Sequence, residues 1–213
     1  MHTVKDAMLL YAVTDRSWVG KQTLMEQVEC ALKGGATCIQ LREKYLDEEE
    51  FLQEALEMKA LCKKYSVPFL INDNVDIAIR SGADGVHVGQ SDMEAGNVRE
   101  LLGPGKIIGV SAQTVDQAKK AETAGADYLG VGAVFSTSTK LDAREVPHEV
   151  LKEICSTVKI PVVAIGGISR KNILELSGSG ADGVALVSAI FGAEDIEAEC
   201  RELKALSREM AEK

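Results

Sequence analysis

GADGVHVG at residues 82–89 carries the pattern that decides the fold, because variants of it recur along the chain. GGAT, GADY and GADG open the same kind of segment at 34–37, 125–128 and 180–183. The four segments lead directly into short runs rich in β-forming residues, namely CIQL, VHVG, LGVG and VALV. A second set of apolar runs lies between them, at 8–13, 67–71, 106–110 and 160–165. The repeat therefore predicts eight strands.

Helices are expected between these strands. Apolar residues with helical spacing follow nearly every run, for instance over 47–65, 114–125 and 193–210. Glycines suited to helix C-caps precede four of the strands, at Gly35, Gly82, Gly125 and Gly180. Strand–helix units repeated through 213 residues imply an all-parallel sheet covered by helices, whose compact closed form is a (β/α)8 TIM barrel of the α/β class. An open doubly wound sheet would want GxGxxG after its first strand, and YAVTDRSW offers none.

Length and composition indicate an ordinary globular protein, and we expect one domain spanning residues 1–213. The formal charge of −9 argues against a nucleic-acid binder, which usually presents a basic stripe. The first residues do not resemble a secretory signal, and no apolar run approaches the length of a membrane span, so we expect a cytoplasmic protein without membrane contact. The five cysteines form no CxxC pair, and we expect small buried hydrophobes rather than a disulfide framework or a zinc site.

Polar residues at the predicted strand ends are the candidates for a functional site. In a barrel of this kind the active site lies at the C-terminal ends of the strands. Taken strand by strand, the candidates are Thr14 and Asp15; Gln40, Arg42 and Lys44; Asn72 and Asp73; His87, Gln90 and Asp92; Ser111; Thr137, Thr139 and Lys140; Gly166 and Gly167; and Ser188.

The motif QLREK at 40–44 shows how such residues converge. Successive side chains of a strand project to opposite faces, so with the apolar residues turned toward the helices, Gln40, Arg42 and Lys44 line the barrel interior and climb to its mouth. An arginine and a lysine placed there suit phosphate oxygens. The alternative is a pair of solvated charges, with Glu43 or the acidic run DEEE as partners.

Asp73 and Asp92 follow neighbouring strands, and two carboxylates at one spot would repel each other unless a cation lay between them. Magnesium is the expected ion, because it commonly takes one or two carboxylates together with phosphate oxygens and waters. The alternative is that either aspartate only N-caps the following helix. His87 lies inside a strand, where a hydrogen-bonded interior histidine is more common than a catalyst.

Two further segments suit anions. The connection VFSTSTKLDARE is the least regular in the chain, and its Thr137, Thr139 and Lys140 suit a mobile lid, with an ordinary surface loop as the alternative. AIGGIS at 164–169 and VSAIFG at 187–192 place backbone amides where many barrels hold a phosphate monoester. Two anion sites at one mouth, one of them with a metal, suggest an enzyme that joins two phosphorylated molecules.

The chain closely resembles the thiamine phosphate synthase (thiamine-phosphate diphosphorylase) family. The matching motifs run in order from about residue 9 to residue 191 and include QLREK, INDNVDIAIRSGADGVHVGQSD, GVSAQT, GADYLGVGAVFSTSTKLDA, VVAIGGIS and GADGVALVSAI. QLREK together with the TSTK loop is the most specific part of the likeness.

This resemblance implies a magnesium-dependent transferase that couples hydroxymethylpyrimidine diphosphate to hydroxyethylthiazole phosphate, giving thiamine phosphate and diphosphate. It implies a dissociative mechanism, in which diphosphate leaves before the thiazole nitrogen captures the pyrimidine methylene cation. The residues it implies for the pyrimidine diphosphate are Gln40, Arg42, Lys44 and Asn72, with Ser111 near the pyrimidine and Asp73 and Asp92 on magnesium. Those for diphosphate and thiazole phosphate are Thr137, Thr139, Lys140, Gly167, Val187 and Ser188, and a catalytic part falls to Arg42, Lys44, Ser111 and Lys140.

Two departures from the family's pattern are visible. FSTSTK stands where the family more often has a proline before TxTK, and Asn74 stands where an arginine is frequent. Both bear on loop rigidity and rate rather than on the reaction. A thiazole tautomerase and a non-catalytic protein that binds thiazole phosphate or thiamine phosphate are the alternatives, and the sequence leaves the oligomeric state open, a homo-oligomer included.

Overall fold

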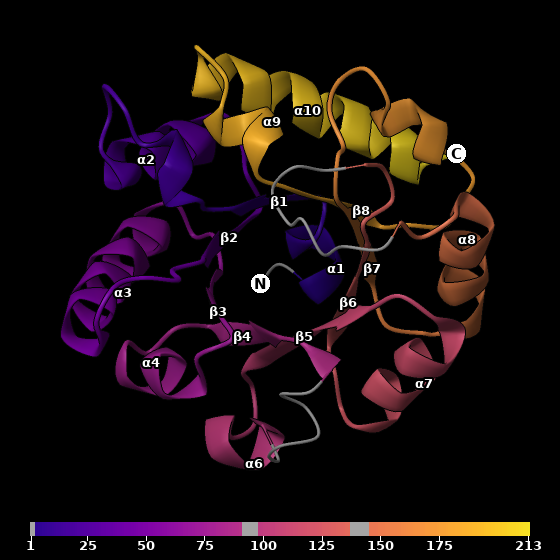
Figure 1. Cartoon of the computed structure of the whole chain (residues 1–213), viewed down its shortest axis with the longest axis horizontal. Helices are drawn as coiled ribbons and strands as arrows, with labels where there is room; N and C mark the ends of the chain where they lie inside the picture. The colour runs from indigo at the N-terminus through magenta and orange to yellow at the C-terminus, as the bar shows by residue number, and fades with distance from the viewer. Residues whose placement is uncertain (1–2, 91–97, 137–144) are drawn as a thin grey trace.

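The eight strands close into a parallel barrel, which confirms the predicted fold. The protein is seen in a computed structural model that describes residues 3–90, 98–136 and 145–213. Strands pair in chain order, and the last strand pairs with the first (Figure 1). They are β1 (Leu10–Val13), β2 (Cys38–Leu41), β3 (Phe69–Asn72), β4 (Gly85–Val88), β5 (Ile107–Ala112), β6 (Tyr128–Gly132), β7 (Val162–Ile165) and β8 (Gly183–Leu186).

Helices surround the barrel in the same order (Figure 1). The α-helices outside it are α2 (Leu24–Lys33), α3 (Glu48–Lys64), α4 (Val75–Arg80), α6 (Val98–Leu102), α7 (Val115–Thr123), α8 (His148–Thr157), α9 (Ser188–Phe191) and α10 (Ile196–Ala211). Two short 3-10 helices, η1 (Arg16–Trp18) and η2 (Ile173–Leu176), follow β1 and β7. Among the described residues, none of these helices is both long and apolar enough to cross a membrane.

Strand alternation separates two apolar layers. Ile39 and Leu41 belong to the large cluster between the sheet and the helices, whereas Tyr11, Leu70 and Tyr128 belong to a smaller cluster inside the barrel. The prediction that the apolar residues of the β2 segment face the helices is therefore confirmed. In such a barrel the inward-pointing side chains of alternate strands form layers, and polar groups among them lie toward the mouth.

Local sequence explains where the helices begin and end. Thr23 caps α2 through a capping box, with its hydroxyl accepting from the Glu26 amide and the Glu26 carboxylate accepting from the Thr23 amide. Gly35 and Gly125 follow α2 and α7 with φ of 98° and 90°, a left-handed conformation that glycine adopts without strain. Before β8 the expected helix is only the four-residue η2, because the chain continues into the glycine- and serine-rich segment SGSG.

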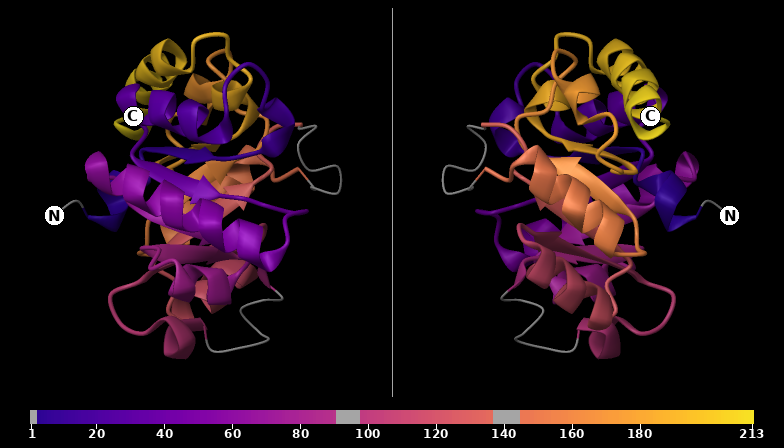
Figure 2. Two further views of the ribbon diagram at one scale, coloured as in Figure 1. Left: turned by 90° about the vertical axis from the view of Figure 1, so that its left-hand side faces the viewer. Right: turned by 90° about the vertical axis from the view of Figure 1, so that its right-hand side faces the viewer.

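A short helix before the first strand closes the barrel at the N-terminal end of its strands. This helix, α1 (Val4–Ala7), is held by a capping box between Thr3 and Asp6. Ala7 and Met8 are buried in the interior cluster beside Tyr11. Figure 2 shows α1, in indigo, at one end of the barrel. The interior is thus sealed at the N-terminal end of the strands, which leaves the opposite end for a ligand.

The five cysteines are free thiols, as the sequence predicts. Cys38, Cys62 and Cys200 are buried, and Cys30 and Cys155 are half-buried. Burial raises the pKa of the Cys62 thiol to about 12, so this side chain behaves as a small hydrophobic group.

Candidate active site

The first cation of QLREK, Arg42, is fixed at the barrel mouth by the end of β1. Its backbone amide donates to the Thr14 hydroxyl at 3.0 Å, and its guanidinium donates to the Asp15 carboxylate at 3.1 Å. Asp15 also accepts from the Ser17 amide at 2.9 Å as the N-cap of η1. Arg42 therefore lies beside β1 with its charge balanced by a carboxylate from the neighbouring strand end.

The second cation, Lys44, reaches the opposite neighbour, β3. Its ammonium group lies 3.1 Å from the Asp73 carboxylate, which also accepts from the Asn72 side-chain amide at 2.7 Å. Asp73 has a φ of 60°, in the left-handed region that few residues other than glycine adopt. Asn74, rather than Asp73, caps α4, by accepting from the Ile77 amide at 2.9 Å. The interpretation of Asp73 as a helix N-cap is therefore wrong, and its carboxylate is turned to the mouth.

The residue between the two cations, Glu43, points the other way. Its carboxylate binds Arg16, which also donates two hydrogen bonds of 2.8 Å to Glu54 of α3. The Glu43 side chain is only 3% exposed. The Glu54 carboxyl is itself partly buried, and this burial raises its pKa although the Arg16 guanidinium lies nearby. The expected alternative partners of Arg42 and Lys44, Glu43 and the acidic run, are thus not the ones observed. Arg16 instead connects the loop after β1 to Glu43 and to α3 on the outside of the barrel.

Inside the barrel, Gln40 begins a chain of hydrogen bonds. Its side-chain amide donates to the Tyr11 hydroxyl at 2.5 Å, and the Tyr11 and Tyr128 hydroxyls lie 2.8 Å apart. The Tyr128 hydroxyl is 2.8 Å from Nδ1 of His87, whose Nε2 is 3.0 Å from the Ser111 hydroxyl. Burial raises the pKa of both tyrosines well above the usual value, so both phenols are neutral. His87 is thus a hydrogen-bonded interior histidine, as the sequence predicts, but its outer nitrogen faces a candidate substrate-binding residue.

The strand ends opposite β2 shape the second part of the mouth. Gly166 and Gly167 follow β7 with φ of 100° and 66°, and a Cβ atom on Gly167 would lie 2.4 Å from the Ser136 carbonyl oxygen. Val187 is half-buried, and Ser188 is exposed at the first residue of α9. These backbones come together at the ends of β6, β7 and β8, the place expected for a phosphate group.

Four of the candidate residues lie outside the described residues, namely Asp92, Thr137, Thr139 and Lys140. Their predicted roles in metal and anion binding stay predictions. Within residues 3–90, 98–136 and 145–213, no group of three His, Cys, Asp or Glu side chains is arranged to hold a metal ion. Asp73 is the predicted metal ligand whose position is seen.

Sequence reasoning did not single out Arg16, Tyr11 or Tyr128. A signal for the tyrosines existed, because both occupy the interior-facing parity of their strands, as Gln40 does. Arg16 gave no comparable signal, since its contacts join a loop, a strand end and a helix that are distant in sequence.

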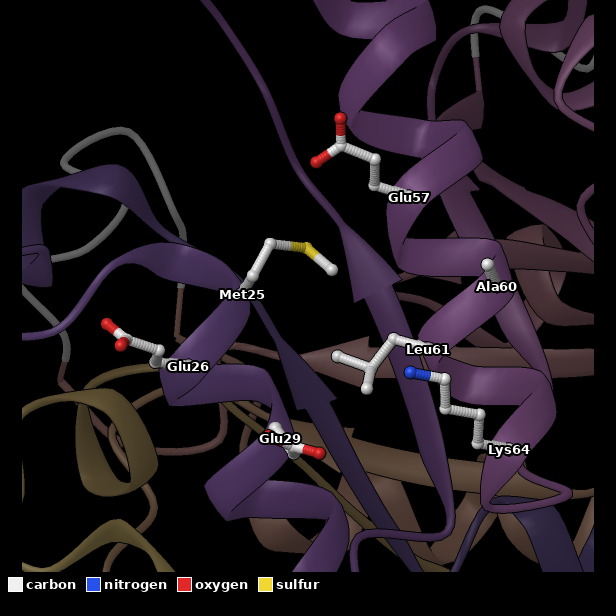
Figure 3. Close-up of a pocket in the computed structure, with 7 residues that line it drawn as sticks. All are labelled: Met25, Glu26, Glu29, Glu57, Ala60, Leu61 and Lys64. Carbon is white, nitrogen blue, oxygen red and sulfur yellow. The ribbon is translucent and has the colours of Figure 1, made fainter.

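Two surface grooves lie away from the mouth, between α2 and α3. The smaller, of about 340 Å³, is drawn in Figure 3 and is lined by Met25, Glu26, Glu29, Glu57, Ala60, Leu61 and Lys64. The larger, of about 590 Å³, continues along the same helices past Arg16 and Leu46. Glutamate is the most frequent lining residue of both grooves, which does not suit the phosphate groups expected at this protein's active site.

Comparison with known proteins gives a consistent result. Residues 10–190 match the family described as thiamine monophosphate synthase. A thiamine-phosphate synthase of Ruminiclostridium cellulolyticum is 50% identical, with 91% of this chain and 92% of that protein covered. A thiamine-phosphate synthase of Alkaliphilus oremlandii is 51% identical, with 92% and 94% covered. Among solved structures, thiamine phosphate pyrophosphorylase from Pyrococcus furiosus is 40% identical, with a TM-score of 0.88 and 98% and 99% covered.

Proposed function

The chain belongs to the thiamine monophosphate synthase family, and we propose that it condenses hydroxymethylpyrimidine diphosphate with hydroxyethylthiazole phosphate to give thiamine phosphate and diphosphate. Family membership supports a thiamine phosphate-forming enzyme; the two substrates, the mechanism and the residue roles below are our proposal. The observation that carries most weight is the alternation at the end of β2, which turns Gln40 inward and sends Arg42 and Lys44 to Asp15 and Asp73.

The two cations are assigned to the diphosphate. Arg42 and Lys44 lie on opposite sides of the β2 end, each 3.1 Å from a carboxylate. A diphosphate carries more negative charge than either carboxylate, so it competes for both cations when it enters. The guanidinium provides a planar pair of donors for phosphate oxygens, and the flexible, more exposed lysine stays in contact with the group as it departs.

In the proposed mechanism the diphosphate leaves first, and the chain's residues stabilise charge on the leaving group. Arg42, Lys44 and, from the loop outside the described residues, Lys140 supply that stabilisation, which is strongest where charge develops. Gln40, Asn72 and Ser111 hold the pyrimidine so that its methylene faces the thiazole nitrogen. No strong general base is required, because the nitrogen attacks through its own lone pair.

The thiazole phosphate is assigned to the opposite strand ends. Gly167 exposes backbone at a point where a side chain would collide with Ser136, and Val187 and Ser188 follow β8 beside it. Thr137 and Thr139 are proposed to complete this pocket. Such a placement brings the acceptor nitrogen and the pyrimidine methylene together over the barrel axis.

Magnesium fits the residues at the β3 end. Asp73 presents a carboxylate that is 45% exposed and hydrogen-bonded by Asn72, and Asp92 is proposed as the second ligand. Such hard oxygen donors suit a small divalent cation that keeps several waters. When bound, the ion would neutralise charge on the diphosphate oxygens. In this arrangement Asp73 must part from Lys44, so diphosphate and metal binding would support one another.

The proposed partners are therefore phosphorylated small molecules. The absence of nucleic-acid and membrane partners, the single domain and the cytoplasmic location stay predictions, and the oligomeric state stays open.

A direct assay tests the proposed function. Purified protein with magnesium and both substrates should form thiamine phosphate, detected as thiochrome fluorescence, and release diphosphate. Lys44→Ala should lower kcat/KM at least about 100-fold, as expected when a charge at the reacting group is removed. Lys33→Ala is the matched control, because Lys33 also pairs with a carboxylate and is similarly exposed, at 48% against 43% for Lys44. No product from folded wild-type protein would refute the proposal and favour a tautomerase or a binding protein.

A further inference from the structure

The hydrogen-bonded chain inside the barrel joins two residues proposed to hold the pyrimidine. It runs from Gln40 through Tyr11, Tyr128 and His87 to Ser111, with every heavy-atom separation between 2.5 and 3.0 Å. Gln40 is almost fully buried, and both tyrosines are at most 1% exposed. Burying polar groups in a barrel interior costs free energy, and here each member of the chain offsets that cost by bonding to the next. A fully connected chain of this kind fixes the orientation of its members.

The direction of the chain follows from its first bond. The Gln40 amide nitrogen can only donate, so the Tyr11 oxygen accepts and its own proton is available for Tyr128. With Tyr128 accepting from Tyr11, its own proton is available to Nδ1 of His87, which we take to accept. A neutral imidazole that accepts at Nδ1 carries its proton on Nε2, and this proton points to the Ser111 oxygen.

Space for this chain is built into the neighbouring strands. A Cβ atom on Gly109 of β5 would lie 2.1 Å from the Tyr128 ring, and one on Gly130 of β6 would lie 3.0 Å from the His87 ring. Gly109 is in register with both rings, since it pairs with His87 on one side and with Tyr128 on the other, and Gly130 pairs with Ser111. Glycine in a strand interior commonly marks such a close approach. The two rings are therefore held in fixed orientations.

We propose that Tyr128 and His87 are positioning residues that hold the Ser111 hydroxyl as a hydrogen-bond donor toward the substrate. This proposal rests on the proposed function. Because Ser111 accepts from His87 Nε2, its own proton is free to point at a ring nitrogen with a lone pair, as a pyrimidine presents. In the reverse direction Ser111 would donate to His87 and would offer the ring nitrogen only a lone pair, which repels it. The buried tyrosines thus determine whether the Ser111 hydroxyl at the mouth donates or accepts.

Tyr11 and Tyr128 make a matched pair for testing this direction. Each loses one buried hydroxyl on substitution by phenylalanine, and the rings contact each other edge to face, with centroids 5.9 Å apart. In Tyr11→Phe the Tyr128 hydroxyl keeps Nδ1 of His87 as its partner, and a phenol donates to an imidazole nitrogen more readily than it accepts from one, so the Nε2–H tautomer should persist. In Tyr128→Phe, Nδ1 loses its donor, so the preference for that tautomer should weaken or reverse.

The first measurement is the ¹⁵N NMR spectrum of the histidine side chains at pH 8, above the usual imidazole pKa. The chain has three histidines, and His87→Gln identifies the relevant signal by its loss. Wild type and Tyr11→Phe should show protonated Nε2 and unprotonated Nδ1 at His87, and Tyr128→Phe should not. Protonated Nδ1 in the wild type would overturn the proposal, because the chain would then run the other way. The wild-type spectrum decides this even where a variant fails to fold.

Kinetics provide the second measurement. Tyr128→Phe should lower kcat/KM for the pyrimidine substrate by about tenfold or more, which is typical of residues that orient a functional group through a hydrogen bond. Tyr65→Phe is the control, because Tyr65 donates its hydroxyl to Glu29 on the outer helices. Unchanged kcat/KM in folded Tyr128→Phe would also overturn the proposal. If the wild type makes no thiamine phosphate, the proposed function fails, while the NMR result still reports the direction of the chain.

Discussion

Replacing Asp73 by asparagine separates a role in chemistry from a role in stability. The Asp73 carboxylate lies 3.1 Å from the Lys44 ammonium group, and the two side chains are 45% and 43% exposed. At that distance the attraction is about 1 kcal/mol in a water-like dielectric, and exposed pairs contribute at most about 1 kcal/mol net. Asparagine also tolerates the φ of 60° at this position. We therefore expect Asp73→Asn to lower Tm by no more than about 4 °C.

The expected effect on catalysis is much larger. Residues that only support a metal ligand are commonly worth about 10–100-fold in affinity or activity. A carboxylate that itself binds the ion should exceed this, so we expect kcat/KM to fall more than about 100-fold at fixed magnesium. The assay is thiochrome detection of thiamine phosphate across a magnesium titration, alongside a thermal melt of the same preparation.

Asp73→Ala and Glu29→Gln complete the design. Alanine adds the strain of a left-handed residue, about 1–2 kcal/mol, so it should be less stable than Asp73→Asn but similarly inactive. Glu29→Gln removes a comparably exposed carboxylate that pairs with Lys33 on α2, and it should be neutral in both assays. If Asp73→Asn kept at least half of the wild-type turnover at saturating magnesium, the carboxylate would be structural, and our assignment would be refuted.

Two further predictions concern the core. Gly109→Ala should lower Tm, because its Cβ would lie 2.1 Å from the Tyr128 ring and overpacking costs about 1–3 kcal/mol; Gly20→Ala, with nothing within 4 Å, should leave the melt unchanged. The Cys62 thiol, with its pKa raised to about 12, is ionised in about one molecule in ten thousand at pH 8. Mass spectrometry should therefore find Cys62 unmodified by iodoacetamide in the native protein and modified in guanidinium, and rapid native labelling would contradict its burial.

The sequence correctly predicts which residues of a strand face the barrel interior and which face the helices, and this alternation accounts for much of the predicted site. The alternation of QLREK correctly turned Gln40 inward and sent its two cations to the mouth. The choice of partners was not readable, because Glu43 is adjacent in sequence and equally charged. Only the packing of α3 and the loop after β1 shows that Glu43 faces outward to Arg16.

The exceptions to the repeat were harder to predict. The helix expected before β8 is only the 3-10 helix η2, because the glycine- and serine-rich segment SGSG follows it directly. Helix α1 was missed because four residues give no periodicity, although the Thr3–Asp6 capping box was a visible signal. The interior tyrosines were not singled out, because sequence does not show which hydroxyls meet across a barrel.

The balance of charge at the mouth would explain how a protein with a net charge of −9 takes the two anionic substrates that we propose. Both cations have a carboxylate partner in the described structure: Arg42 pairs with Asp15, and Lys44 pairs with Asp73. The pairs keep both cations in place at little cost, because partly exposed ion pairs are weak and a diphosphate can displace their carboxylates. Displacement at Lys44 would also release Asp73 at the edge where the proposed metal binds. The same weak pair would therefore hold the lysine ready and couple anion binding to metal binding.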